Sequence, residues 1–129
     1  MGIETALAEL IAFIPAQVPA LVGKVSATFP EKPVAVPLVV LDVVSPTYAR
    51  MLSGQVGRHL VRLSVLEDDP VSADLRVDAI LAALDAATTL TTCHYAGVRG
   101  GSGLRRYEKV PNAIGRDIDI EIVTITVRS

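Results

Sequence analysis

The sequence is poor in aromatic residues and carries no excess of positive charge. It has two Phe, three Tyr and no Trp among 129 residues, so it offers few platforms on which nucleobases could stack. Its formal net charge of −2 argues against a protein that wraps duplex DNA by neutralising phosphates, which needs a basic face. An acidic balance is still compatible with a pore through which DNA passes.

Cysteine is almost absent, and long apolar runs are missing. The one cysteine, Cys93, has no partner for an intramolecular disulfide, which fits a cytoplasmic or virion setting better than a disulfide-stapled secreted protein. The segment from Met1 to Phe13 contains Glu4 and Glu9 and no basic stretch, unlike a signal peptide. No apolar run approaches the roughly 20 residues needed to cross a bilayer. We therefore expect a soluble protein with no membrane partner.

The length and the many aliphatic residues of the chain suit one domain with an aliphatic core. A chain of 129 residues, half of them apolar, is long enough to bury one hydrophobic core. We predict a single domain spanning residues 1–129. Because aromatic residues are few, Val, Leu, Ile and Ala must fill its core.

The chain begins with a helical pattern. Apolar residues recur at three- and four-residue spacing from Ile3 to Ile14, which predicts an amphipathic helix. Pro15 marks its expected end, because proline disfavours the helical conformation in the residue before it. A second helical piece is expected from Val18 to Val22, with Gly23 as its C-terminal stop.

Three strands are expected next. Pro30, Pro33 and Pro37 make the segment after the first of them an extended connector. The mixture of Pro, Ser and Gly from Ser45 to Gly57 predicts a long hairpin connection between the second and the third. The expected strands are Val25–Phe29, Pro37–Val44 and Arg58–Leu66.

A second helix is predicted to begin at Asp69. Its carboxylate can cap free amide groups, and Pro70 is tolerated in a first turn. The outer side carries Asp74, Asp78 and Asp85. The inner stripe is expected to comprise Ala73, Val77, Ile80, Leu81, Leu84 and Thr88.

The last third predicts two further strands and a basic, glycine-rich loop. A short strand is expected from Thr91 to Val98, and four glycines between Gly97 and Gly103 predict a flexible loop. From Arg116 to Arg128 the apolar alternation changes phase near Ile122 and Val123. A period-two strand cannot keep one buried face through such a shift, so we predict either a β-bulge there or burial of both faces at the end.

This order of elements predicts an α+β fold. Hairpin-linked strands in the middle of the chain favour an antiparallel or mixed sheet of four to five strands, with two helices packed on one face. The strand from Leu38 to Val44 and the last strand then carry more apolar surface than two helices cover. Surplus of that kind marks an interface.

No catalytic or metal-binding pattern is found. Adjacent strand residues point to opposite faces, so Cys93 and His94 cannot pair as nucleophile and base. His59, Cys93 and His94 do not supply the paired ligand spacing of a zinc site. The glycine-rich segment lacks the ending of a phosphate-binding P-loop. We expect no enzyme activity, no metal and no cofactor.

The order and spacing of these elements resemble the tail terminator, or tail completion, proteins of long-tailed bacteriophages. The resemblance covers nearly the whole chain and is one of pattern, with no catalytic signature. The glycine-rich basic loop matches no motif of that family. The resemblance rests on the helix opening Ile3-Glu4-Thr5-Ala6-Leu7, the Pro-bounded strand Val36-Pro37-Leu38-Val39-Val40, the strand Arg58–Leu66, the helix Ser72–Asp85 and a closing strand after a variable charged loop.

The resemblance implies a structural virion protein made in the host cytoplasm. It implies a homohexameric ring at the head-tail junction that caps the tail tube, meets the head-side connector or stopper protein, and lets DNA pass through its lumen without sequence reading. We expect the segments Ser45–Gly57 and Gly97–Pro111 to make the contacts. The interface residues expected in them are Tyr48, Arg50, Met51, Arg99, Arg105, Arg106 and Lys109.

Two alternatives stay open. The chain could be another head-to-tail connector or a tail tube protein, which would polymerise repeatedly. In a different class, it could be a small α+β enzyme that binds an anionic metabolite at Arg99, Arg105 and Arg106, since arginine makes bidentate contacts with such groups.

Overall fold

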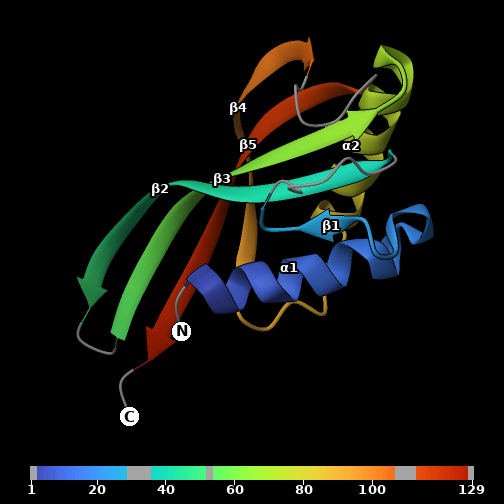
Figure 1. Cartoon of the computed structure of the whole chain (residues 1–129). Helices are drawn as coiled ribbons and strands as arrows, with labels where there is room; N and C mark the ends of the chain where they lie inside the picture. The colour runs from blue at the N-terminus through green and yellow to red at the C-terminus, as the bar shows by residue number, and fades with distance from the viewer. Residues whose placement is uncertain (1–2, 29–35, 52–53, 107–112, 128–129) are drawn as a thin grey trace.

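A computed structural model describes residues 3–28, 36–51, 54–106 and 113–127. Five strands form one mixed sheet in the order β1-β2-β3-β5-β4, in which β1 runs parallel to β2 and every other pair is antiparallel (Figure 1). This is the α+β fold that the sequence predicts. The elements in chain order are α1 (Ile3–Gln17), the short 3₁₀ helix η1 (Pro19–Leu21), β1 (Val25–Ser26), β2 (Leu38–Met51), β3 (Gly54–Glu67), α2 (Pro70–Asp85), β4 (His94–Arg106) and β5 (Ile114–Val127).

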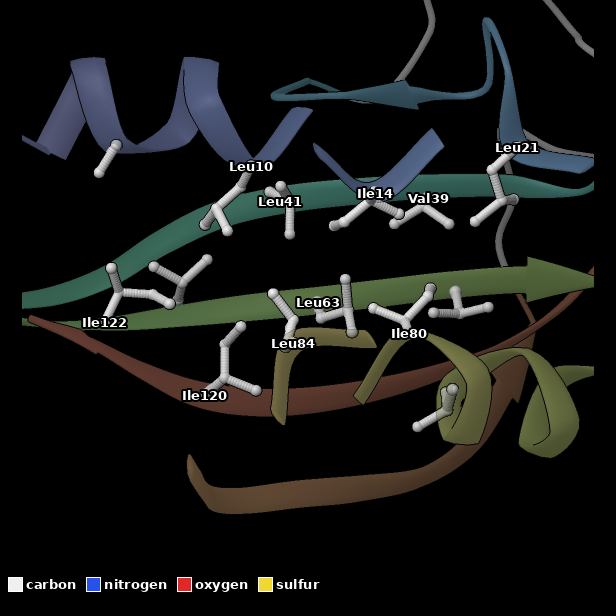
Figure 2. Close-up of a cluster of buried hydrophobic side chains, with 14 of the residues drawn as sticks. Leu10, Ile14, Leu21, Val39, Leu41, Leu63, Ile80, Leu84, Ile120 and Ile122 are labelled. Atoms are coloured by element: carbon white, nitrogen blue, oxygen red, sulfur yellow. The ribbon is translucent and has the colours of Figure 1, made fainter. Parts of the chain in front are cut away.

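Both helices pack on the same face of the sheet, as predicted. Helix α1 buries Leu10 and Ile14, and α2 buries Ile80 and Leu84, all against one cluster of strand residues (Figure 2). Each such side chain contributes roughly 1.5 to 3 kcal/mol through burial. The strand residues of this core are Val39, Leu41, Val61, Leu63, Val65, Ile120 and Ile122.

The first helix runs further than the sequence predicts. Pro15 lies inside α1, which continues to Gln17, so the expected end at Pro15 is wrong. A proline in the last turn removes only its own amide donor, and the Val18 amide still donates to the Ile14 carbonyl at 2.8 Å. The helical piece that follows is the short η1, and Gly23 ends it with a φ of 74°.

The expected hairpin connection from Ser45 to Gly57 is wrong. Strand β2 continues through Met51, β3 already begins at Gly54, and the two pair from Ser45 opposite Leu60 to Met51 opposite Gly54. The Gly, Pro and Ser residues predict a connection when only the local sequence is considered. Strand β5 pairs with β3 along this whole length, and this pairing stabilises the extended conformation. Strand β1 is only two residues long, and the Pro-rich connector expected after it lies almost entirely outside the described residues.

The glycine-rich segment is also not a loop. Gly97–Gly103 lies inside the edge strand β4, whose pairing with β5 shifts register at three points. The backbone of this bulged strand requires glycine at two positions, Gly97 and Gly101. Gly97 has a φ of 120°, which side chains rarely allow, and a Cβ on Gly101 would lie 3.3 Å from the Asp117 carbonyl oxygen.

We expect Gly101→Ala to lower the free energy of unfolding by about 1 kcal/mol, because overpacked atoms must move the neighbouring strand. The added Cβ would also meet the Ile118 Cδ1 at 3.1 Å. Gly100→Ala is the matched control, since its Cβ would meet nothing closer than Asp119 Oδ2 at 3.9 Å. Urea unfolding followed by circular dichroism compares the two. Equal stability of both variants would contradict the close packing at Gly101.

Of the two alternatives predicted for the last strand, the β-bulge is wrong, and burial of both faces at its end falls on side chains outside the described residues. Strand β5 pairs with β3 without a shift from Ile114 to Val127. The extra residue lies in the partner strand β4, between Tyr95 opposite Ile122 and Gly97 opposite Glu121. Because β5 stays in register, its change of apolar phase carries the apolar positions from one face of the sheet to the other.

Helix α2 follows its prediction closely. Ala73, Val77, Ile80 and Leu84 are buried, whereas Asp74, Asp78 and Asp85 are exposed. Leu81 packs at the edge of the core. Thr88 is the exception: it lies beyond the end of the helix at Asp85 and is exposed, since the chain has left the helical path by then.

Asp69 is the N-cap of α2. Its Oδ1 accepts the Ser72 amide at 2.8 Å and its Oδ2 accepts the Ser72 hydroxyl at 2.9 Å, and these bonds lower the pKa of the carboxyl. We expect Asp69→Ala to cost about 1 kcal/mol of folding free energy. The neighbouring exposed Asp68→Ala should cost less than about 0.5 kcal/mol. Thermal unfolding of the two variants measures the difference, and a larger loss for Asp68→Ala would refute the assignment.

Candidate assembly surface

Three strands continue together as an arm, whose outer part runs beyond the helices, whereas His59, Ile122 and Thr124 at its base are buried. We define the arm as Ser45–Met51 of β2, Gly54–Leu60 of β3 and Glu121–Val127 of β5, which pair side by side. Figure 1 shows these strand ends running on past the N-terminal end of α1. The register shift between Val43 and Ser45 in β2 lies where the arm begins.

Both sides of the arm have open strand edges. Within the described residues, β1 pairs with β2 only at Val39 and Val40, and β4 pairs with β5 no further than Val123. The outer edges of Ser45–Met51 and Thr124–Val127 therefore have no strand beside them in this part of the chain. Edges of this kind present backbone donors and acceptors to which another chain can pair.

The polar and apolar faces exchange sides at the arm. In the rest of the sheet the helix-covered face is apolar, with Val61 and Leu63 opposite Ile120 and Ile118. Along the arm, the same alternation places mostly polar positions on that side and apolar ones on the other. The arm positions on the face away from the helices are Ser45, Thr47, Ala49, Met51, Gly54, Val56, Arg58, Leu60, Glu121, Val123, Ile125 and Val127.

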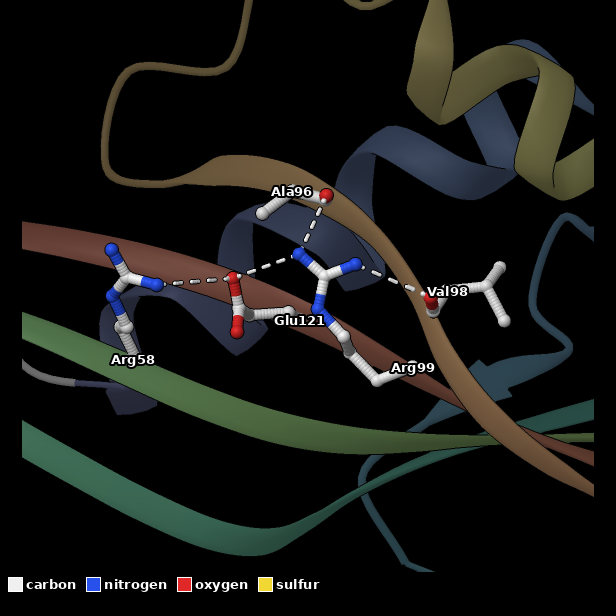
Figure 3. Close-up of polar contacts among 5 residues, drawn as sticks. All are labelled: Arg58, Ala96, Val98, Arg99 and Glu121. Atoms are coloured by element: carbon white, nitrogen blue, oxygen red, sulfur yellow. Dashed lines mark hydrogen bonds and ion pairs between the residues drawn. The ribbon is translucent and has the colours of Figure 1, made fainter.

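The face away from the helices is charged at the base of the arm and just beyond it, at Arg58, Glu121, Arg62 and Asp119. Arg62 Nε donates to Asp119 Oδ1 at 3.0 Å, and this hydrogen bond and charge raise the pKa of the guanidinium. Glu121 lies between Arg58 at 3.9 Å and Arg99 at 3.2 Å (Figure 3). These pairs are solvent-exposed, so each contributes at most about 1 kcal/mol. They make this part of the face hydrophilic.

Arg99 is held within its own subunit. Besides Glu121, its guanidinium donates to the carbonyl oxygens of Ala96 at 3.2 Å and Val98 at 3.3 Å (Figure 3). A side chain with three internal acceptors is less suited to bind an anionic metabolite or a partner than the sequence implies. Arg99 remains about half exposed.

The other predicted interface residues fall at opposite ends of the sheet. Tyr48, Arg50 and Met51 belong to the arm. Arg105 and Arg106 pair with Gly115 and Ile114 at the far end of β5. The structure therefore brings the first three together and does not join the two groups into one site. Lys109 lies outside the described residues.

A carboxylate clamp that the sequence does not reveal fastens α1 to the chain before β4. Glu9 accepts the Thr91 and Thr92 amides at 3.0 and 2.9 Å and their hydroxyls at 2.9 and 2.8 Å. Burial alone would raise the pKa of this carboxyl, but the four bonds outweigh it and lower the pKa to about 2. No local pattern signals the clamp, because its partners are more than 80 residues away.

Cys93 and His59 are buried within the structure, whereas His94 is exposed. Burial, and then the nearby Glu9 carboxylate, raise the pKa of the Cys93 thiol to about 11, so it is not a thiolate nucleophile near neutral pH. His94 is exposed at the start of β4. His59 is fully buried, shares a hydrogen bond of 3.0 Å with the Thr124 hydroxyl, and has its pKa lowered by burial.

Neither metal ligation nor membrane crossing is indicated in the described part of the chain. Those residues contain no cluster of three or more His, Cys, Asp or Glu side chains that could hold a metal ion. The α-helices described in the structure, α1 and α2, are too short or too polar to cross a bilayer.

Comparisons with known proteins identify the family. The family model described as Tail completion protein gp17 matches residues 10–124. A chain in the solved structure titled "Virion of native gene transfer agent (GTA) particle" aligns with a TM-score of 0.66 and 22% identity, covering 93% of this chain and 92% of that chain. At that identity the likeness shows a shared fold. No curated protein matches the chain. Because the family match spans most of its length, the chain belongs to the Tail completion protein gp17 family.

Proposed function

We propose that this protein is a non-catalytic structural part of a phage-type tail. Copies assemble into a ring, most simply a hexamer, that terminates the tail tube at the head-tail junction and meets the head-side connector. DNA passes through the lumen without base reading. The family match over residues 10–124 carries this proposal.

The arm supports an assembly role. It leaves strand edges open on both sides within the described residues and places apolar positions on a face that neither helix covers. A protein that worked as a monomer would be exposed to edge-to-edge aggregation through such a surface. The net charge of −2 also fits a lumen, because passing DNA meets no strongly basic chain.

Electron microscopy and light scattering test the proposal. The purified protein is imaged and sized alone and after mixing with tail tubes that lack their terminal ring. Rings of uniform size, free or at one end of each tube, are expected. A protein that stays monomeric and leaves the tube ends bare would refute the proposal. Long tubes formed by the protein alone would identify a tail tube protein instead.

A further inference from the structure

Both outer sides of the sheet have an open strand edge. In the described part of the chain, β4 has a strand only on its β5 side, and β1 covers β2 only at Val39 and Val40. The edge of β2 is therefore open over Leu41–Met51, and that of β4 over His94–Arg106. Edges of this length present rows of backbone donors and acceptors to which a strand of another chain can pair.

The two edge strands carry exposed aliphatic side chains. Val44 of β2 is 42% exposed, and Val98 and Leu104 of β4 are 44% and 39% exposed. Register shifts in both strands limit their pairing with unrelated strands. Aliphatic side chains at an edge are stabilised by burial against a pairing strand, so these two edges are suited to a partner that matches their register.

The two open edges match in length and are offset along the sheet. The edge of β4 lies level with residues 114–123 of β5, to which β4 pairs directly. The open edge of β2 lies level with residues 118–127 of β5, through the β3 residues between them. Both ends of these ranges differ by four residues, 118 against 114 and 127 against 123.

The strand directions favour the pairing of unlike edges. Strands β2, β3, β5 and β4 alternate in direction across the sheet, so β4 runs opposite to β2. Copies related by rotation around an axis along the strands keep these directions, so β4 of one copy meets β2 of the next as an antiparallel neighbour. Pairing of like edges would instead close a dimer and leave the other edge of each copy open.

An offset of four residues suits a closed ring. Each copy adds the four strands β2, β3, β5 and β4 to a continuous sheet and shifts it by four residues, so the total shear equals the number of strands for any number of copies. The eight-stranded barrel with a shear of 8 has the same ratio, and its strands tilt by about 36°. That tilt lies within the range of about 35–45° found in closed barrels.

We propose that the open edge of β4 in one copy of this chain pairs with the open edge of β2 in a second copy, so that the sheets of all copies join into one closed barrel. This pairing rests on the proposed ring-forming function and names the two edges that build the ring.

The offset determines which side chains meet. It places Leu104 of one copy beside Val43 of the next, since these residues lie level with positions 116 and 120 of β5. Leu104 lies opposite Arg116, which forms an ion pair with Asp74 of α2. Val43 lies opposite Val61 of the core. Both side chains are therefore on the helix-covered face, and an even offset keeps that face continuous between copies.

Cysteine crosslinking tests this pairing. Val43→Cys and Leu104→Cys are made singly and together in the full chain, and a short bismaleimide is added to assembled rings, free or on tail tubes. Within one copy β3 and β5 separate the two positions by roughly 14 Å, whereas opposite residues of paired strands are about 5 Å apart. Cys93 is 3% exposed and does not compete. The double variant should give a covalent ladder up to the ring size, and neither single variant should crosslink.

Other outcomes separate this pairing from the proposed function. Rings in the microscope without a ladder would overturn the pairing and leave the ring function standing. Dimers from either single variant would overturn it in favour of like edges. A wild-type protein that forms no rings and binds no tube ends would refute the ring itself.

A charge substitution provides an independent measurement. Leu104→Asp places a carboxylate against Val43 of the next copy and should lower the fraction of protein in rings at least tenfold. Leu75→Asp is the matched control, because Leu75 is 64% exposed on α2 and belongs to neither edge. Circular dichroism confirms that both variants fold. Equal ring formation by the two variants would overturn the pairing.

Discussion

Replacing Leu63 with alanine is expected to lower the free energy of unfolding by about 3 kcal/mol, the middle of the range for buried leucines. Leu63 is completely buried at the centre of β3, between Leu41 of β2 and Ile118 of β5. Its removal leaves a cavity that three strands and two helices cannot readily close. Urea unfolding followed by circular dichroism measures the loss.

Leu104→Ala is the matched control for Leu63. The same side chain is removed, but Leu104 is 39% exposed on the edge strand β4. Its loss should change stability by less than about 0.5 kcal/mol. If both variants lost the same stability, the core would not be centred on β3.

Glu9→Gln is expected to cost about 2 kcal/mol at neutral pH, because hydrogen bonds to a charged acceptor are worth roughly 1.5 to 3 kcal/mol each and partial exposure reduces that. The amide nitrogen that replaces one carboxylate oxygen can no longer accept from Thr91. Helix α1 should then be held less firmly to the segment before β4. Thermal unfolding at pH 7 measures the cost.

The same carboxylate predicts an acid response with a defined sign. The folded-state pKa of Glu9, about 2, is below its ordinary value of 4.5, so its contribution is complete above about pH 4.5 and is lost as pH falls towards 2. The stability difference between wild type and Glu9→Gln should therefore shrink across that window. Glu4→Gln, an exposed change on the same helix, is the matched control for the loss of one charge. A difference that stayed constant down to pH 2 would contradict the clamp.

The elements with complete local signals were predictable from sequence. Helix α2 has its cap at Asp69, its proline at the first position and an apolar stripe with one helical period, and the structure confirms all three. From Gly57 to Leu63 the residues of β3 alternate in burial, whereas Ser64 and Leu66 are buried along with Leu63 and Val65. In both cases the information needed lies within one stretch of chain.

The wrong predictions share a physical cause. Gly and Pro between Ser45 and Gly57, and the glycines after Gly97, are turn formers when considered locally, yet both segments are strands. Their conformation is set by β5, which pairs with β3 on one side and with β4 on the other. The residues of β5 that pair with Gly54, Gly57, Gly97 and Gly101 are distant in sequence, and distant partners leave no trace in local composition.

The candidate assembly surface was only half predictable. The phase change near Val123 signals apolar positions on both faces of the last strand, which is a local property of alternation. The sequence alone could not distinguish a bulge in that strand from a change of face. That choice depends on β5 keeping register with β3 over its whole length.

The sequence by itself determined that this chain is an α+β protein with an aliphatic core and a capped second helix, because periodicity and capping act over a few residues. The surplus of apolar surface expected on Leu38–Val44 is wrong for Leu38–Leu41, which are buried within the chain. Only the tertiary structure decided that Leu38 and Val40 pack with Leu66 and Ala113 in a second buried cluster, that Arg99 is held by Glu121, and that Glu9 clamps Thr91 and Thr92. Each of these depends on strands or side chains meeting across long stretches of chain, and such meetings are fixed by packing rather than by local preference.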